Sequence, residues 1–135
     1  MNMKKLLAFF VLVAGMSIAV APLFAHHGRG ATYDMKKQVT LKGTVTEVAW
    51  RNPHVVIYLD VKDADGKPVN WAFENSNVST LARQGYNRNT MRVGDEITAV
   101  VNPSAKGAPI GLVVKVILPG GKEVMSRENG GNPVD

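Results

Sequence analysis

The stretch that sets the fold is QVTLKGTVTEVAW, residues 38–50. Its apolar residues stand first at odd positions and then at even positions, at Val48 and Trp50. Alternation with a period of two is typical of a strand with one buried face, and a change of parity indicates an extra residue that bends the strand. We therefore predict a long, bent first strand over residues 38–50, with a bulge at Gly43 or within Val45–Val48.

Four further strands and one short helix are predicted from similar patterns. Turns separate them, since Pro53 lacks a backbone donor and Gly66 accepts the positive φ of a tight connection. Asparagine and serine caps begin the helix, and Gly85 ends it. The predicted strands cover residues 54–62, 69–74, 97–101 and 110–118, and the predicted helix covers residues 75–85.

Three of these strands have an apolar face that we assign to the core. The residues of these faces are Val55, Ile57, Leu59 and Val61 in the second strand, Val69, Trp71 and Phe73 in the third, and Leu112, Val114, Val116 and Leu118 in the fifth. On the opposite face of the second and third strands, the alternation leaves His54, Tyr58 and Glu74.

The order of three strands, a helix and two strands predicts the fold class. We expect an all-β domain with small α content: an OB-like five-stranded Greek-key barrel with a short helix between strands three and four. Closing the sheet would hide edges that otherwise invite aggregation. A roll or a sandwich is the structural alternative.

Residues 1–25 have the three parts of a secretory signal peptide. Lys4 and Lys5 precede an apolar run, and Ala25 is the small residue expected before a cleavage site. The run is also long enough to serve as a membrane anchor if it is not cleaved, and this is the alternative. An uncleaved signal is the one way in which we expect the protein to attach to a membrane. The predicted parts of the chain are a signal peptide (1–25), an N-terminal arm (26–37), the barrel domain (38–126) and a flexible tail (127–135).

Composition limits the class of protein. Subtracting residues 1–25, with their two lysines, from 135 residues and a formal charge of +5 leaves 110 residues and +3. That length suits one domain, which we expect to be a monomer in the bacterial periplasm or outside the cell. So mild a charge does not call for a nucleic-acid partner. The chain has no cysteine, so its apolar core must hold it without disulfides.

The three histidines of the chain suggest a metal site. Cleavage after Ala25 would make His26 the first residue, whose α-amine and imidazole could close a chelate ring on one metal ion. His27 or His54 could add the next nitrogen, and planar nitrogen donors favour Cu(II). Glu74 could orient an imidazole as a hydrogen-bond acceptor. Zinc is the alternative metal, but it would need a fourth ligand such as Glu74 or water. Solvated histidines that bind nothing are the plain alternative.

A second hypothesis needs no metal. Trp50, Asn52 and Tyr58 could form a face for a small ligand, a peptide or a glycan, as in a periplasmic adaptor. The alternative for Trp50 is that it covers the mouth of the barrel. We identify no catalytic residue, since no serine lies in a nucleophile elbow and the chain has no thiol. A non-enzymatic binding protein is therefore our leading hypothesis, and a copper redox enzyme is a third one.

The stretch after the signal peptide contains several distinctive segments: the His26-His27 opening, Gly43-Thr44-Val45, Trp50-Arg51-Asn52-Pro53-His54, Trp71 with Glu74, Leu81 to Gly85, and Val93-Gly94-Asp95. Through these segments it resembles a family of small secreted bacterial proteins with a β-barrel domain and no established activity. The most specific part of the resemblance is the Trp-x-Asn-Pro-His segment. The resemblance implies export and a small β-rich domain, and it lends no catalytic residues.

Overall fold

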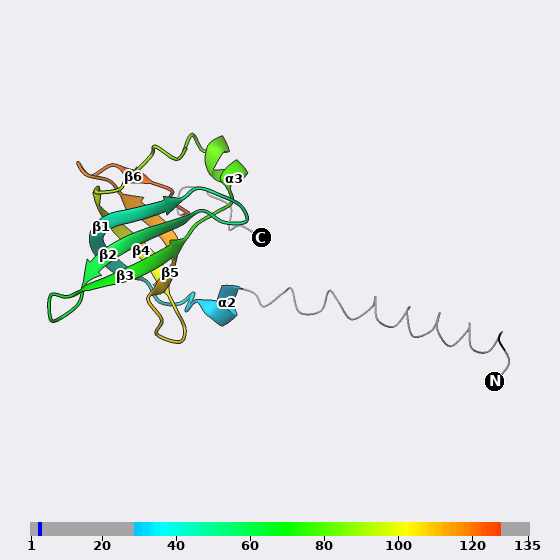
Figure 1. The fold of residues 1–135 in the computed structure, drawn as a ribbon, viewed down its shortest axis with the longest axis horizontal. Coiled ribbons are helices and arrows are strands. Elements are labelled where there is room, and N and C mark those ends of the chain that lie inside the picture. Colours follow the sequence, from blue (N-terminus) through cyan, green and yellow to red (C-terminus); the bar gives the residue numbers. More distant parts are fainter. Residues whose placement is uncertain (1–2, 4–28, 128–135) are drawn as a thin grey trace.

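The computed structural model describes Met3 and residues 29–127, and Figure 1 shows their arrangement. Strands dominate, with two short helices. In chain order the elements are α2 (Arg29–Thr32), β1 (Val39–Ala49), β2 (Val56–Lys62), β3 (Pro68–Glu74), α3 (Val78–Arg83), β4 (Glu96–Pro103), β5 (Ile110–Ile117) and β6 (Glu123–Val124). Within this part of the chain, no helix is long and apolar enough to span a lipid bilayer.

The strands form one closed sheet. Their order is β3-β2-β1-β4-β5-β6, and an additional parallel pairing of β3 with β5 closes strands β1 to β5 into a barrel. The closing pairs are Ala72 with Ile110, Phe73 with Gly111, and Glu74 with Leu112. The helix α3 stands between β3 and β4 in the chain, so the predicted OB-like barrel with its short helix is confirmed.

The bend in β1 lets one strand serve both halves of the barrel. Residues 39–44 pair with β4 and residues 43–49 pair with β2, so the strand changes partners near Gly43. The register with β2 shifts between Val45 and Glu47, which places the bulge in the second of the two predicted positions. Gly43 has a different role: a Cβ there would lie 2.5 Å from the backbone oxygen of Asp60, so the two strands approach too closely for a side chain.

The core confirms most of the predicted faces. Ile57 pairs with Phe73 across β2 and β3, and neither side chain is exposed. Trp71 packs against this core while partly buried, with its ring centroid 5.9 Å from that of Phe73. The full cluster consists of Val45, Val55, Ile57, Leu59, Val61, Phe73, Leu81, Met91, Ile97, Ala99, Val101, Val113, Val116, Val124 and Met125.

The predicted inner face of β5 is wrong for its first half. Val113 belongs to the core cluster, whereas Leu112 and Val114 are buried but lie outside it. The cause is a register shift opposite Val100 and Val101 of β4, which changes the parity of β5 partway along. Val116 and Leu118 keep their predicted side against the core.

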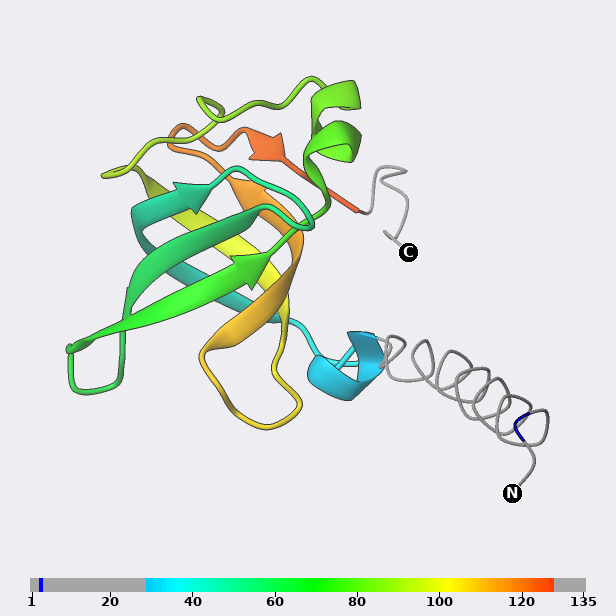
Figure 2. The ribbon, with the colours of Figure 1, turned by 45° about the vertical axis from the view of Figure 1, so that its right-hand side comes forward.

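The predicted N-terminal arm is ordered where the structure describes it. The Asp34 amide donates to the Pro103 oxygen at 2.8 Å, and the Ala105 amide donates to the Thr32 oxygen at 2.9 Å. A β-bridge joins Tyr33 to Ser104. These contacts hold α2 and the residues after it against the connection between β4 and β5, as Figure 2 shows. The predicted signal peptide, apart from Met3, and the pair His26-His27 lie outside the described residues.

Arg127 marks the start of the predicted flexible tail but is itself held by the barrel. Its amide donates to the Val114 oxygen at 2.8 Å, and its guanidinium donates to Asn102 Oδ1 at 2.6 Å. Asn102 is buried, and its side-chain Nδ2 donates in turn to the Lys37 backbone oxygen at 2.7 Å. One buried side chain of β4 therefore joins the end of the arm to the end of the barrel domain. The remainder of the predicted tail lies outside the described residues.

Candidate functional site

The Trp-x-Asn-Pro-His segment forms the turn that positions His54. The Asn52–Pro53 peptide bond is cis, and Asn52 Oδ1 accepts a hydrogen bond from the Val78 amide at 3.1 Å. The side chain of Asn52 therefore ties the β1–β2 turn to the first residue of α3. This contact gives Asn52 a structural role in the segment, and its place on a ligand face stays a prediction.

His54 comes directly before a residue that extends the ladder between β2 and β3. The Val55 amide donates to the Ser76 oxygen at 3.0 Å, and the Asn75 amide donates to the Val55 oxygen at 2.8 Å. The Val55 side chain is fully buried, so His54 points to the outer face. The backbone that carries the imidazole is therefore fixed by hydrogen bonds and by the core.

His54 and Glu74 form a pair on this outer face. Glu74 lies opposite Val56 in the β2–β3 ladder, so His54 is its diagonal neighbour, two residues along the strand direction. His54 Nδ1 lies 3.3 Å from Glu74 Oε1, with side-chain exposures of 33% and 25%. Because a carboxylate only accepts hydrogen bonds, we assign the proton between them to Nδ1 of the ring. The sequence placed both residues on one face, and the structure shows that they meet.

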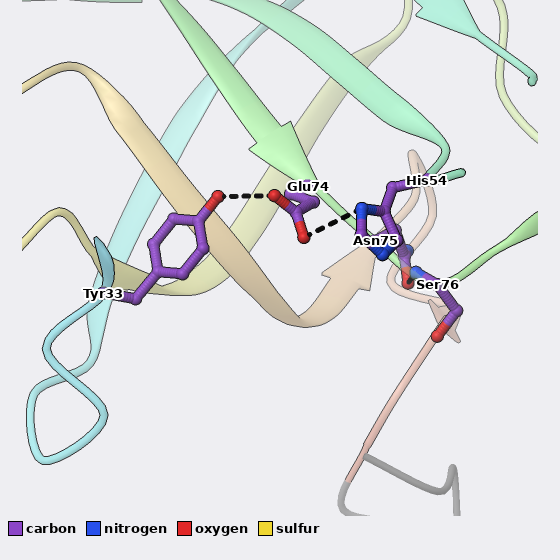
Figure 3. A network of polar contacts seen from close by, with 5 residues as sticks. All are labelled: Tyr33, His54, Glu74, Asn75 and Ser76. Carbon is purple, nitrogen blue, oxygen red and sulfur yellow. Dashed lines mark hydrogen bonds and ion pairs between the residues drawn. The ribbon is translucent and has the colours of Figure 1, made fainter. Parts of the chain in front are cut away.

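Tyr33 is the third member of this network, and the sequence analysis did not assign it to the site. Its hydroxyl donates to Glu74 Oε2 at 2.8 Å. Figure 3 shows Tyr33 and His54 on either side of the Glu74 carboxylate, each facing a different oxygen. Tyr33 is only 5% exposed although it belongs to the arm. The described part of the arm is therefore linked to His54 through a single residue, Glu74.

Asn75 and Ser76 support the strand end that carries Glu74. Both are buried polar residues. Asn75 Oδ1 accepts from the Ser76 amide at 2.7 Å, and its Nδ2 donates to the sulfur of Met125 at 3.1 Å. Buried polar groups with partners rigidify their surroundings, so these contacts hold the end of β3 from the inside. The pair thus belongs to the scaffold of the site.

The two aromatic residues of the second hypothesis lie on different sides of the sheet. Trp50 is partly buried and packs against the core cluster, which favours the alternative that it covers the mouth of the barrel. Tyr58 pairs with Glu47 and Ala72 in the opposite parity to the buried Ile57, so it lies on the outer face. This arrangement does not assemble Trp50 and Tyr58 into a shared stacking platform.

The described site combines an imidazole, a carboxylate and a phenol. In residues 29–127, the structure shows no group of three or more His, Cys, Asp or Glu side chains that could hold a metal ion. His54 is the one histidine of the described residues, and the other two candidate ligands, His26 and His27, stand just before α2 in the sequence. The site can therefore contribute one imidazole, oriented by Glu74, to a set of ligands completed from elsewhere.

Comparisons with known proteins support the assignment to a family. Searches of curated proteins and of solved structures gave no match. A family model described as a family of unknown function, DUF6152, matches residues 13–114, which is more than half of the chain and spans β1 to most of β5. The match includes Tyr33, His54 and Glu74. The chain therefore belongs to the DUF6152 family of unknown function.

Proposed function

We propose that the protein is an exported, non-enzymatic binding protein that holds Cu(II) between its mature N-terminus and His54. His26 supplies the α-amine and an imidazole, and His54 supplies a further nitrogen, with His27 as the alternative. The observation that supports this most directly is the Tyr33–Glu74–His54 network, because it attaches the N-terminal arm next to the described histidine.

The contact between His54 and Glu74 is the kind that metal-binding histidines make. A ligating imidazole usually gives its other ring N–H to a carboxylate, a carbonyl or water, which fixes the tautomer and raises the basicity of the ligand nitrogen. Here Glu74 faces Nδ1 at 3.3 Å, so the metal would bind at Nε2. Both side chains are about a quarter to a third exposed, so a metal ion could reach the pair from solvent.

The position of the arm supplies the second argument. Backbone contacts from Thr32 and Asp34 fix the arm on the connection between β4 and β5, and Tyr33 reaches across to Glu74. His26 and His27 stand just before α2 in the sequence. Attachment of the arm at Tyr33 limits the distance over which the chain must fold to bring an N-terminal nitrogen to His54.

The separation of Trp50 from Tyr58 makes the metal-free adaptor the weaker proposal. Packing of the indole against the core leaves only Tyr58 on the outer face for a peptide or a glycan. A copper redox enzyme would need an open coordination position and a surface for its substrate. Turnover of ascorbate and peroxide by the copper-loaded protein would support the enzyme and contradict a non-enzymatic carrier.

Copper titration of tag-free protein, purified after export, tests the proposal. Mass spectrometry first establishes whether His26 is the first residue, since any other start removes the chelate. We expect one Cu(II) per chain, with nitrogen ligands visible by electron paramagnetic resonance. His26→Gln and His54→Gln should each weaken binding strongly, whereas Glu74→Gln should weaken it by about 10–100-fold.

Tyr58→Phe is the matched control, because Tyr58 lies on the same outer face but outside the network. It should bind Cu(II) like the wild type. Unchanged affinity in His54→Gln would remove His54 from the site and reduce the proposal to a terminal chelate. Stoichiometric binding of Zn(II) in preference to Cu(II) would contradict the choice of metal.

A further inference from the structure

We infer that Tyr33 is a positioning residue that couples docking of the N-terminal arm to the orientation of the His54 ring. The inference concerns the regulation of the proposed metal site and rests on the proposed function for its effect on copper. Its structural part concerns only Tyr33, Glu74 and His54, and it can be tested without metal.

Glu74 is the shared element of this coupling. Its two oxygens face different partners: Oε2 accepts from the Tyr33 hydroxyl at 2.8 Å, and Oε1 lies 3.3 Å from His54 Nδ1. A carboxylate held at one oxygen has less freedom to rotate, so the hydroxyl fixes the direction in which the other oxygen faces the imidazole. Loss of the Tyr33 contact would remove this restraint on the Glu74 carboxylate.

Tyr33 is also part of the docked arm. Its backbone bridges Ser104, while its hydroxyl reaches Glu74 of β3. Because β5 lies between β4 and β3 in the closed sheet, the Tyr33 side chain must span the outer face of β5. Leu112 lies in this region, opposite Glu74, and is buried although it does not belong to the core cluster. The Tyr33 ring is therefore a packed side chain whose position depends on where the arm sits.

These contacts make arm docking and His54 orientation favour each other. When one event stabilises another, the coupling is reciprocal: a metal ion that binds the oriented imidazole must also stabilise the docked arm. The docked arm in turn raises the affinity for the metal, since less ordering remains to be done when the ion arrives. Metal binding thus stabilises the docked arm, and the docked arm strengthens metal binding.

The first test uses metal-free protein and nitrogen NMR of the His54 ring in its neutral form. In the wild type we expect the tautomer with the proton on Nδ1 to dominate. Tyr33→Phe keeps the ring but removes the hydroxyl, so the tautomer preference should weaken. The Asp34 amide, which bonds to Pro103, should exchange its hydrogen about tenfold faster.

Two variants separate positioning from packing. Glu74→Gln places an amide N–H group opposite Nδ1, so the tautomer preference should reverse toward the proton on Nε2. Tyr86→Phe is the matched control: Tyr86 packs against the core after α3 and is not a member of the Tyr33–Glu74–His54 network, so the variant should change neither the tautomer nor the Asp34 exchange. An unchanged tautomer and unchanged exchange in Tyr33→Phe would overturn the inference.

Addition of Cu(II) then tests the regulation. Copper should slow Asp34 exchange in the wild type and slow it much less in Tyr33→Phe, whose copper affinity should fall about tenfold. If the wild type binds no copper, the proposed function fails, while the NMR experiment on the metal-free protein still decides the role of Tyr33. If copper binds but Asp34 exchange is the same with and without it, the coupling between metal binding and arm docking is refuted and the proposed function survives.

Discussion

A single methyl group added at Gly43 should weaken the barrel at the bend of β1. Gly43 pairs with Val61 of β2 and with Ile97 of β4, so it is enclosed by strands on both sides. A Cβ at this position would lie 2.5 Å from the Asp60 oxygen and 3.1 Å from the Asp60 carbonyl carbon. These are backbone atoms, which cannot rotate away as a flexible side chain could. Gly43→Ala must therefore separate β1 from β2.

The size of this effect follows from two opposing contributions. Overpacking in a fitted site costs typically 1–3 kcal/mol, and a rigid backbone neighbour places Gly43→Ala near the upper end, at about 3 kcal/mol. The lower entropy of the unfolded alanine chain returns roughly 0.4–1 kcal/mol. The net loss is about 2 kcal/mol, which in a domain of this size lowers Tm by roughly 8–16 °C.

Thermal unfolding followed by circular dichroism measures this loss directly. Gly30→Ala is the control, because Gly30 belongs to α2 and the added methyl group would meet no described atom within 4 Å beyond its chain neighbours and the helix backbone. That variant should match the wild type or gain up to about 1 kcal/mol. A Gly43→Ala protein with the wild-type Tm would refute the close approach of β1 and β2 on which this reasoning depends.

Three smaller predictions can be checked by urea unfolding. Ile57→Val removes one methyl group from a fully buried site and should cost about 0.5–1.5 kcal/mol; no change would mean that the site collapses without a cavity. Asn77→Ala removes the oxygen that accepts from the Thr80 amide and should cost about 1 kcal/mol, with Asn77→Asp retaining most of the stability. Asn102→Ala should cost about 1–3 kcal/mol and removes the acceptor of the Arg127 guanidinium. The Arg127 amide, which donates to the Val114 oxygen, should then exchange faster; equal exchange there would contradict the proposed tie.

The parts of the fold that could be predicted are those where polar and apolar residues alternate strictly. The parity change between Val45 and Val48 predicted the bulge, since threonine and glutamate mark the outer positions around it. In β5 the run Leu112-Val113-Val114 is apolar at both parities, so alternation could not reveal the register shift that turns Val113 inward. A bulge within a continuous apolar run leaves no signal in a pattern of period two.

The candidate site likewise has a part that could be predicted from the sequence and a part that could not. His54 and Glu74 could be placed on one face from parity alone, and the short β2–β3 connection brought their strands together. Tyr33 could not be predicted, because it acts from an aperiodic segment that is held by a β-bridge and backbone hydrogen bonds to the β4–β5 connection. The contact with Glu74 spans 41 residues of sequence and depends on closure of the barrel. A large aromatic residue in an otherwise polar, glycine-containing stretch was the one sequence signal that could have indicated docking.

Glu74 lies on the seam of the barrel, where only three residue pairs join β3 to β5. Closing this seam joins the β2–β3 hairpin to β5, and the long stretch of chain between β3 and β5, residues 75–109, makes closure entropically costly. Any ligand that binds only when β3 and β5 are paired would stabilise the closed barrel. At a concentration a hundred times its Kd, such a ligand adds about 2.7 kcal/mol to the free energy of unfolding. Ligand binding and folding of this protein would then be thermodynamically linked, so a measurement of either would report on the other.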